Sequence, residues 1–199
     1  ALLKADASTL YDSWTSSYNG GESFANVFKS HKGGDYSSAK SCVEQMIDGC
    51  ADIANEVGTA KIGDPYNLYM QGDTEKALYA VESWYSWHSR EDYSNNIHSI
   101  RNTYYGTLDG TISESSLSAL IAKADAALDT KLKSAIKEAT DGILNIPQPF
   151  RSNINSNESR SAMTLCANLE ELLSQNLKAA LSNLKEEDMQ KVVDNYVDM

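Results

Sequence analysis

Proline is scarce in this sequence. The 199 residues include 3 prolines, whereas average usage of about 5% would supply about ten. Few helix-breaking residues, together with much Ala, Leu, Ser and Lys, favour long helices over many short strands. Hydrophobic residues make up 41% of the chain, which is enough for a globular core.

Basic residues are also few. The chain carries 17 Lys and Arg against 28 Asp and Glu, which gives a formal net charge of −11. Nucleic-acid binding depends on patches of Lys and Arg that replace counterions, and no such patch is visible. We therefore expect no nucleic-acid partner.

The sequence lacks a long apolar run, a visible signal peptide and a set of pairable cysteines. No stretch approaches the roughly 20 apolar residues of a membrane span, so we expect a cytosolic chain or one already processed. Cys42 and Cys50 lie eight residues apart in a helical pattern, about 12 Å along the axis and too far for a disulfide. With Cys166 they are expected to be small buried hydrophobes, which leaves the compartment open.

Helical periodicity runs along most of the chain. Apolar residues at this spacing predict six to seven helices and no strand. Short connections between amphipathic helices make neighbours antiparallel. The expected fold is therefore an all-α, antiparallel helical bundle in a single domain, residues 1–199.

Some element boundaries can be predicted as well. A helix of about 20 residues through Val43 and Val57 should end near Gly58. Residues 61–67 should form a turn, because Pro65 disfavours helix at the residue before it. One long helix should begin at Ser113 and continue past Ile143 until the prolines that follow stop it.

Residues 82–96, ESWYSWHSREDYSNN, hold a His and a Glu three residues apart. His88 and Glu91 on one helical turn could hold a metal ion, but zinc needs three or four protein ligands and no HExxH pattern occurs. Ser89 and Asp92 resemble a capping box, which predicts Ser89 as the helix N-cap and His88 outside the helix. A metal site, a binding surface and a plain helix start all remain open.

The same segment mixes aromatic and polar side chains. Its aromatic residues cannot all face one side of a helix, because neighbours are about 100° apart. Such mixtures are typical of binding pockets and interface hot spots. We predict no catalytic or metal-ligating residue but a ligand-binding surface formed by Glu82, Ser83, Trp84, Ser86, His88, Ser89, Asp92 and Asn96.

Three stretches resemble the imelysin-like proteins, specifically their Bacteroides-type members. They are IGDPYN at residues 62–67, ESWYSWHSREDYSNNIHSIRNTYYG at residues 82–106, and the C-terminal QKVVDNYVDM. The last is similar to the opening helix of the usual imelysin domain, so its position here implies a circularly permuted member. The resemblance implies two related four-helix bundles with a functional site between them, of which this chain would supply roughly half.

The resemblance also implies a function. Imelysin-like proteins are exported bacterial proteins, periplasmic or lipid-anchored in the outer membrane, and are associated with iron uptake. The family was once classed as metallopeptidases because of a GxHxxE motif. In SWHSRE, Ser86 stands where that glycine would fall, and the segment is a different one, so we read the family motif as absent.

These observations leave three functions. The first is a non-enzymatic binding protein of iron or haem uptake, with the rest of the fold, an iron-bearing ligand or an envelope protein as partners. The second is a zinc peptidase of the HxxE type, completed by residues outside this chain. The third is a structural helical interaction module.

The C-terminus carries a further expectation. The apolar helical pattern reaches Met199 without a stop signal, so we expect a fragment of a longer chain. The face formed by Val192, Val193 and Tyr196 should then be covered by a complementary chain.

Overall fold

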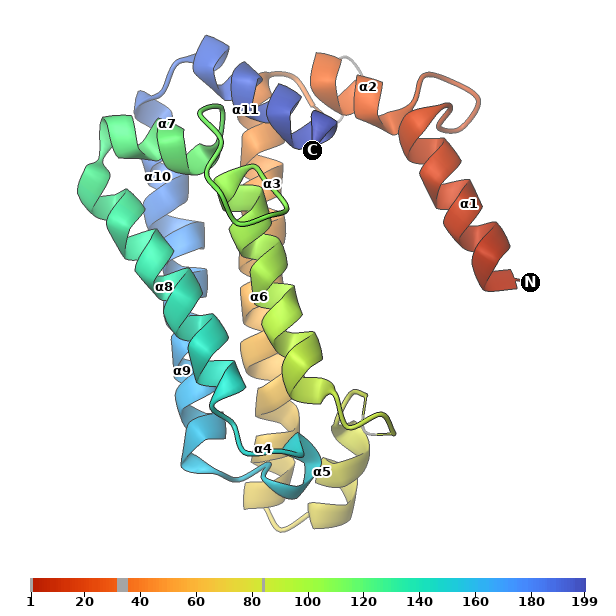
Figure 1. The fold of residues 1–199 in the computed structure, drawn as a ribbon, viewed down its shortest axis with the longest axis vertical. Coiled ribbons are helices and arrows are strands. Elements are labelled where there is room, and N and C mark those ends of the chain that lie inside the picture. Colours follow the sequence, from red (N-terminus) through yellow and green to blue (C-terminus); the bar gives the residue numbers. More distant parts are fainter. Residues whose placement is uncertain (1, 32–35, 84) are drawn as a thin grey trace.

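The computed structural model describes residues 2–31, 36–83 and 85–199, and every regular element within these ranges is helical. Figure 1 shows the arrangement. The elements are α1 (Leu2–Thr15), α2 (Phe24–Ser30), α3 (Ala39–Asn55), the π-helical η1 (Glu56–Gly63), α4 (Asp64–Met70), α5 (Thr74–Ala80), α6 (Ser89–Tyr105), α7 (Leu117–Ala124), α8 (Ala126–Leu144), the 3₁₀ turn η2 (Phe150–Ser152), α9 (Asn157–Glu171), the π-helical η3 (Leu172–Leu177), α10 (Lys178–Ala180), the 3₁₀ turn η4 (Leu181–Asn183) and α11 (Glu186–Asp198).

Four long helices form the bundle. In a closed ring, α3 packs on α6, α6 on α8, α8 on α9, and α9 on α3. Neighbours in this ring run in opposite directions (Figure 1). The predicted all-α antiparallel bundle is therefore confirmed. In α6 the residues at helical spacing, Tyr93, Ile97, Ile100 and Tyr104, are all at most 1% exposed.

The predicted helix end at Gly58 and the turn at residues 61–67 are wrong. The helix continues from α3 through η1 into α4 without a break. Pro65 is the second residue of α4, directly after the π-helical η1, and the helix continues through it. Gly58 instead permits close packing on α9, because a Cβ at this position would lie 2.8 Å from the Cβ of Cys166.

The single long helix predicted from Ser113 is also wrong. It divides at Asp125, whose backbone is extended at φ −151° and ψ 89°. The Asp125 carboxylate accepts hydrogen bonds from the amides of Ala127 and Leu128, at 3.1 and 3.0 Å, and so caps α8. The apolar period crosses this break, whereas the cap interrupts the helix.

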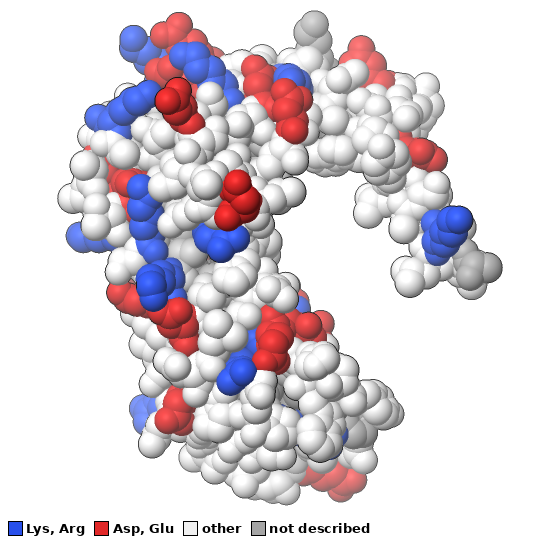
Figure 2. Space-filling model, viewed as in Figure 1, with Lys and Arg blue, Asp and Glu red and all other residues white. Residues whose placement is uncertain are grey.

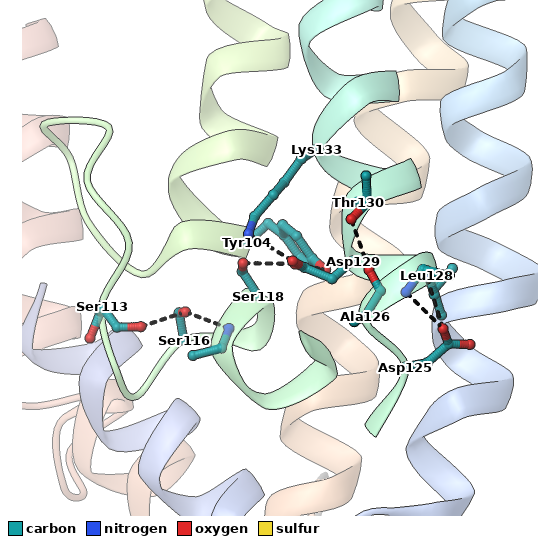
Figure 3. A network of polar contacts seen from close by, with 12 residues as sticks. Tyr104, Ser113, Ser116, Ser118, Asp125, Ala126, Leu128, Asp129, Thr130 and Lys133 are labelled. Atoms are coloured by element: carbon teal, nitrogen blue, oxygen red, sulfur yellow. Dashed lines mark hydrogen bonds and ion pairs between the residues drawn. The ribbon is translucent and has the colours of Figure 1, made fainter. Parts of the chain in front are cut away.

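A buried carboxylate joins α6, α7 and α8 (Figure 3). Asp129 is 5% exposed. Its Oδ1 accepts hydrogen bonds from Ser118 Oγ at 2.8 Å and Tyr104 Oη at 3.0 Å, and its Oδ2 pairs with Lys133 Nζ at 2.7 Å. Burial and the nearby Asp129 charge raise the pKa of Tyr104, so its hydroxyl remains a donor.

The C-terminal helix is packed within this chain. Val192 and Val193 are buried and Tyr196 is partly buried, with its ring 6.2 Å from that of Phe28. The carboxylate of Glu186 accepts a hydrogen bond from the first amide of α3. The expectation that another chain covers this face is therefore wrong, because α3 and α2 already cover it.

The N-terminal helix α1 has no buried residue. Leu3 is 82% and Leu10 72% exposed. The ring of Trp14 lies 5.3 Å from that of Phe24, which attaches the end of α1 to α2. The remainder of α1 extends away from the bundle, and Figure 2 shows open space between the two.

The three cysteines are buried thiols, as the sequence predicts. Burial raises the pKa of Cys50 and of Cys166 to about 12, and that of Cys42 to about 11. They are therefore protonated, unreactive parts of the core. Within the described residues, no helix combines the length and the apolar character needed to cross a bilayer.

Asp129→Ala should lower the free energy of unfolding by about 3 kcal/mol, because it leaves two buried hydroxyls and an ammonium without their acceptor. The matched control is Asp141→Ala on the same helix. Asp141 pairs with Lys137, and their side chains are 52% and 75% exposed. Its loss should cost at most about 1 kcal/mol. Urea unfolding measures both. Equal losses would contradict a central role for Asp129.

Gly58→Ala should destabilise the protein by about 1–3 kcal/mol, because the new methyl group meets Cys166 across the η1–α9 contact. Gly49→Ala is the control, since this helical glycine has no atom within 4 Å of a built Cβ. It should stabilise the protein by about 0.5–1 kcal/mol through helix propensity. Thermal unfolding of both variants checks the predicted opposite signs.

Candidate functional site

A pocket of about 670 Å³ lies where the segment before α6 meets the loop after α8. It is lined by Tyr85, Ser86, Trp87, His88, Glu91, Gln148 and Pro149. Both contributing segments lie at the end of the bundle opposite α2 and α11 (Figure 1). The chemical groups of the pocket are an imidazole, a carboxylate, a side-chain amide, a hydroxyl, a proline ring and two exposed aromatic rings.

The start of α6 differs from its prediction. The helix begins at Ser89 and the cap position is His88, which makes no side-chain capping bond. The Ser89 hydroxyl is buried and donates to the Glu82 carbonyl at 2.7 Å. The prediction of Ser89 as N-cap is therefore wrong, because its hydroxyl joins the helix to the preceding loop. His88 lies outside the helix and Asp92 in its first turn, as predicted.

The loop before α6 is held in a strained shape. Ser83 and Trp87 have positive φ angles of 58° and 64°, which L side chains rarely adopt. The Ser83 carbonyl accepts from the Trp87 amide at 3.0 Å and from the Ser86 hydroxyl at 3.1 Å. This tight turn leaves Tyr85 and Trp87 84% and 52% exposed. The Arg151 guanidinium lies 4.2 Å from the centre of the Trp87 ring, a cation–π contact.

Arg90 connects the two sides of the pocket. Its Nη1 donates to the carbonyls of Leu144 at 2.8 Å and Ile146 at 3.2 Å, near the C-terminal end of α8. Its Nη2 pairs with Glu91 Oε1 at 3.0 Å. The same Glu91 oxygen accepts a hydrogen bond from the Gln148 amide. The Glu91 carboxylate is thus oriented by groups from both segments.

Glu91 is ionised in this setting. Burial alone would raise its pKa, but a backbone hydrogen bond and the Arg90 guanidinium outweigh burial and lower it. Its second oxygen, Oε2, is buried and has no hydrogen-bond partner among the described residues. Arg90 Nε and Asn96 Oδ1 share this property. A buried charged oxygen without a donor requires a partner such as an ordered water or an ion.

The structure places the predicted surface residues in different surroundings. Ser86 and His88 line the pocket. Glu82 pairs with Lys61 at 2.8 Å instead. Ser83 and Ser89 shape the loop. Asp92 and Asn96 lie along α6, outside the pocket lining. Trp84 lies outside the described residues.

The predicted surface left out five residues that line this pocket: Tyr85, Trp87, Glu91, Gln148 and Pro149. It also left out Arg90, which orients Glu91. Gln148 follows Glu91 by 57 residues. The only sequence signal in its segment is a pair of prolines, which indicates the end of a helix and not a neighbour in space.

Metal ligation needs more groups than this pocket supplies. Within the described residues, no three His, Cys, Asp or Glu side chains lie close enough to hold a metal ion. His88 and Glu91 could supply two ligands, and a complete zinc site would require others.

Ser89→Ala should lower the free energy of unfolding by about 1–2 kcal/mol, because the hydrogen bond from the buried Ser89 side chain to the Glu82 carbonyl is lost. The control is Ser86→Ala, whose exposed hydroxyl is replaced by water at a cost within about 0.5 kcal/mol. Chemical unfolding compares the two. If Ser86→Ala costs as much as Ser89→Ala, the hydroxyl does not anchor the loop.

The comparisons with known proteins agree with this geometry. The family model described as Imelysin, a peptidase family by name, matches residues 1–176. A crystal structure described as an imelysin peptidase from Bacteroides ovatus is 59% identical, with a TM-score of 0.97 over 99% of this chain and 57% of that one. A search of curated proteins finds no match.

A second crystal structure is described as a putative iron-regulated protein A precursor from Parabacteroides distasonis. It is 36% identical, with a TM-score of 0.81 over 88% of this chain and 52% of that one. The chain thus spans between 52% and 57% of the length of these two relatives. Both the family model and the shared helical bundle show that this chain belongs to the imelysin family.

Proposed function

We propose that this chain is part of a non-enzymatic binding protein of the bacterial cell envelope that serves iron uptake. The Parabacteroides relative is described as an iron-regulated precursor, and a precursor is a protein that is processed, as exported proteins are. This description supports a periplasmic or outer-membrane-anchored location. Iron or haem is the ligand class that this function requires.

The observation that carries the proposal is that Glu91, whose carboxylate is oriented by Arg90 and Gln148, and His88 line the same pocket. An oriented carboxylate and an exposed imidazole can supply an oxygen and a nitrogen ligand to iron. The faces of Tyr85 and Trp87 can pack on a flat ring. Such pockets, with apolar walls and a few convergent polar groups, are typical of small-molecule sites.

The remaining part of the imelysin fold is the proposed structural partner. The exposed Leu3 and Leu10 of α1 support it, because exposed apolar helix faces mark interaction surfaces. An iron-bearing ligand or an envelope protein would then bind at or beside the pocket.

A zinc peptidase is the second candidate, favoured by the description of the Bacteroides ovatus structure as a peptidase. His88 and Glu91 would be two of its ligands, and others would have to come from elsewhere. Metal analysis distinguishes the two functions. A peptidase holds about one zinc ion per chain and loses activity to a chelator, which would overturn the binding proposal.

His88→Ala should weaken binding of haemin or ferric citrate about tenfold, about 1.4 kcal/mol, and reduce growth on limiting iron. Its stability should change by less than about 0.5 kcal/mol, because this exposed side chain makes no capping bond. Fluorescence titration measures binding, since Trp87 lines the pocket.

His31→Ala is the control. The His31 side chain forms a hydrogen bond with Gln190 in the region of α2 and α11, at the other end of the bundle from the pocket. It should leave binding unchanged. If neither probe binds, or if both variants bind like the parent, the pocket is not the site and the structural-module alternative gains support.

A further inference from the structure

The groove between α6 and α8 has a chemistry that differs from the rest of this acidic protein. It has a volume of about 420 Å³ and lies away from the pocket at the start of α6. Its lining includes His98, Arg101 and Tyr105 from α6, and Lys133, Lys137 and the acidic Asp141 from α8. Figure 2 shows Lys and Arg side chains over neighbouring stretches of these two helices.

The three cations of this groove are unequally neutralised. Lys133 pairs with the buried Asp129, and Lys137 pairs with Asp141. Arg101 makes no ion pair with a carboxylate in the described part of the chain. Its Nε and Nη2 donate to the neutral amide oxygen of Asn102, at 3.2 and 2.9 Å. The positive charge of Arg101 is therefore available to an anion.

The pKa of His98 is sensitive to the charges of the groove. Burial lowers its pKa, and the positive charge of Arg101 lowers it further. A neutral imidazole next to a guanidinium can donate one hydrogen bond to an incoming anion. The groove thus offers a planar cation, two ammonium groups nearby and one neutral donor.

The floor of the groove is less polar than its rim. Ile136 and Thr140 are 2% and 7% exposed, and the ring of Tyr105 packs against the core. The accessible apolar surface of the groove therefore comes mainly from Tyr105, which is only partly buried. A ligand with an anionic head and a small apolar body would cover both parts.

We propose that the α6–α8 groove is a second binding site, for a small organic anion whose carboxylate or phosphate group pairs with Arg101. The planar guanidinium fits both head groups, because it can donate two parallel hydrogen bonds. Lys133 and Lys137, each paired with an aspartate, line the groove from the opposite helix, and the ring of Tyr105 contacts the apolar body. The site does not depend on the function proposed for the His88 pocket.

The test is a titration of the protein with phenyl phosphate and with benzoate, followed through the ring signals of His98 by NMR. Both probes have the same apolar body, and their relative affinities identify the preferred head group. We expect saturable shifts for at least one of them. We also expect the pKa of His98 to rise in the complex, because a bound anion favours the imidazolium. Benzyl alcohol, which is neutral, should cause no saturable shift.

Arg101→Gln should weaken anion binding at least about tenfold, since a charge-assisted hydrogen bond is lost. It should also raise the pKa of His98 in the unliganded protein, which shows that the variant is folded and that the two groups are neighbours. If Arg101→Gln does not fold, Lys137→Gln, on an exposed side chain, should also weaken binding.

Two control variants test whether anion binding is specific to this groove. Lys76→Gln removes the same charge from an exposed position on α5 and should leave anion affinity unchanged. His88→Ala should do the same, so failure of one site is distinguishable from failure of the other. Absence of saturation by either anion would overturn the proposal, as would equal weakening by Arg101→Gln and Lys76→Gln.

Discussion

A carboxylate buried inside a helical bundle constrains everything around it, because it is stable there only when donors surround it. Asp129 meets this requirement with a tyrosine from α6, a serine from α7 and a lysine from its own helix. The direction of α7 follows from this contact, since Ser118 must reach the interior. The break at Asp125 is what lets α7 turn back towards α6 while α8 continues down the bundle.

The pocket depends on a second polar contact at the opposite end of α8. Arg90 bonds carbonyls near the end of that helix and at the same time orients Glu91. The start of α6, the end of α8 and the Gln148 loop are therefore one unit. The strained turn through Ser83 and Trp87 attaches to this unit through Ser89, and it places aromatic rings beside the carboxylate. Positive φ angles at non-glycine residues persist only where surrounding contacts impose them, which is common at ligand sites.

Much of the fold could be predicted from the sequence, because the spacing of apolar residues indicates both that a segment is helical and which of its faces is buried. Tyr93, Ile97, Ile100 and Tyr104 share one face by spacing alone, and that face is the core. The predictions failed where a single polar or small residue determines where a helix ends or how closely two helices pack. Asp125 ends a helix that the apolar period continues, and Gly58 suggests a stop when its function is close packing. For the candidate pocket, the predicted surface included two lining residues from the segment before α6 and none from the loop after α8. Ser86 and His88 line the pocket, whereas Gln148 comes from a distant loop.

By itself the sequence determined the helical class, the antiparallel bundle, the buried cysteines and the resemblance to the imelysin family, since all four depend on local spacing or on motifs. Only the tertiary structure decided which polar groups meet. Asp129 and Tyr104 are 25 residues apart, and Arg90 and Leu144 are 54 residues apart. The structure also decided which apolar faces are covered: Val192 and Val193 are buried by α3, whereas Leu3 and Leu10 remain exposed. The physical reason is that an amphipathic pattern specifies that a face will be buried, but the partner is chosen by packing between segments far apart in the chain.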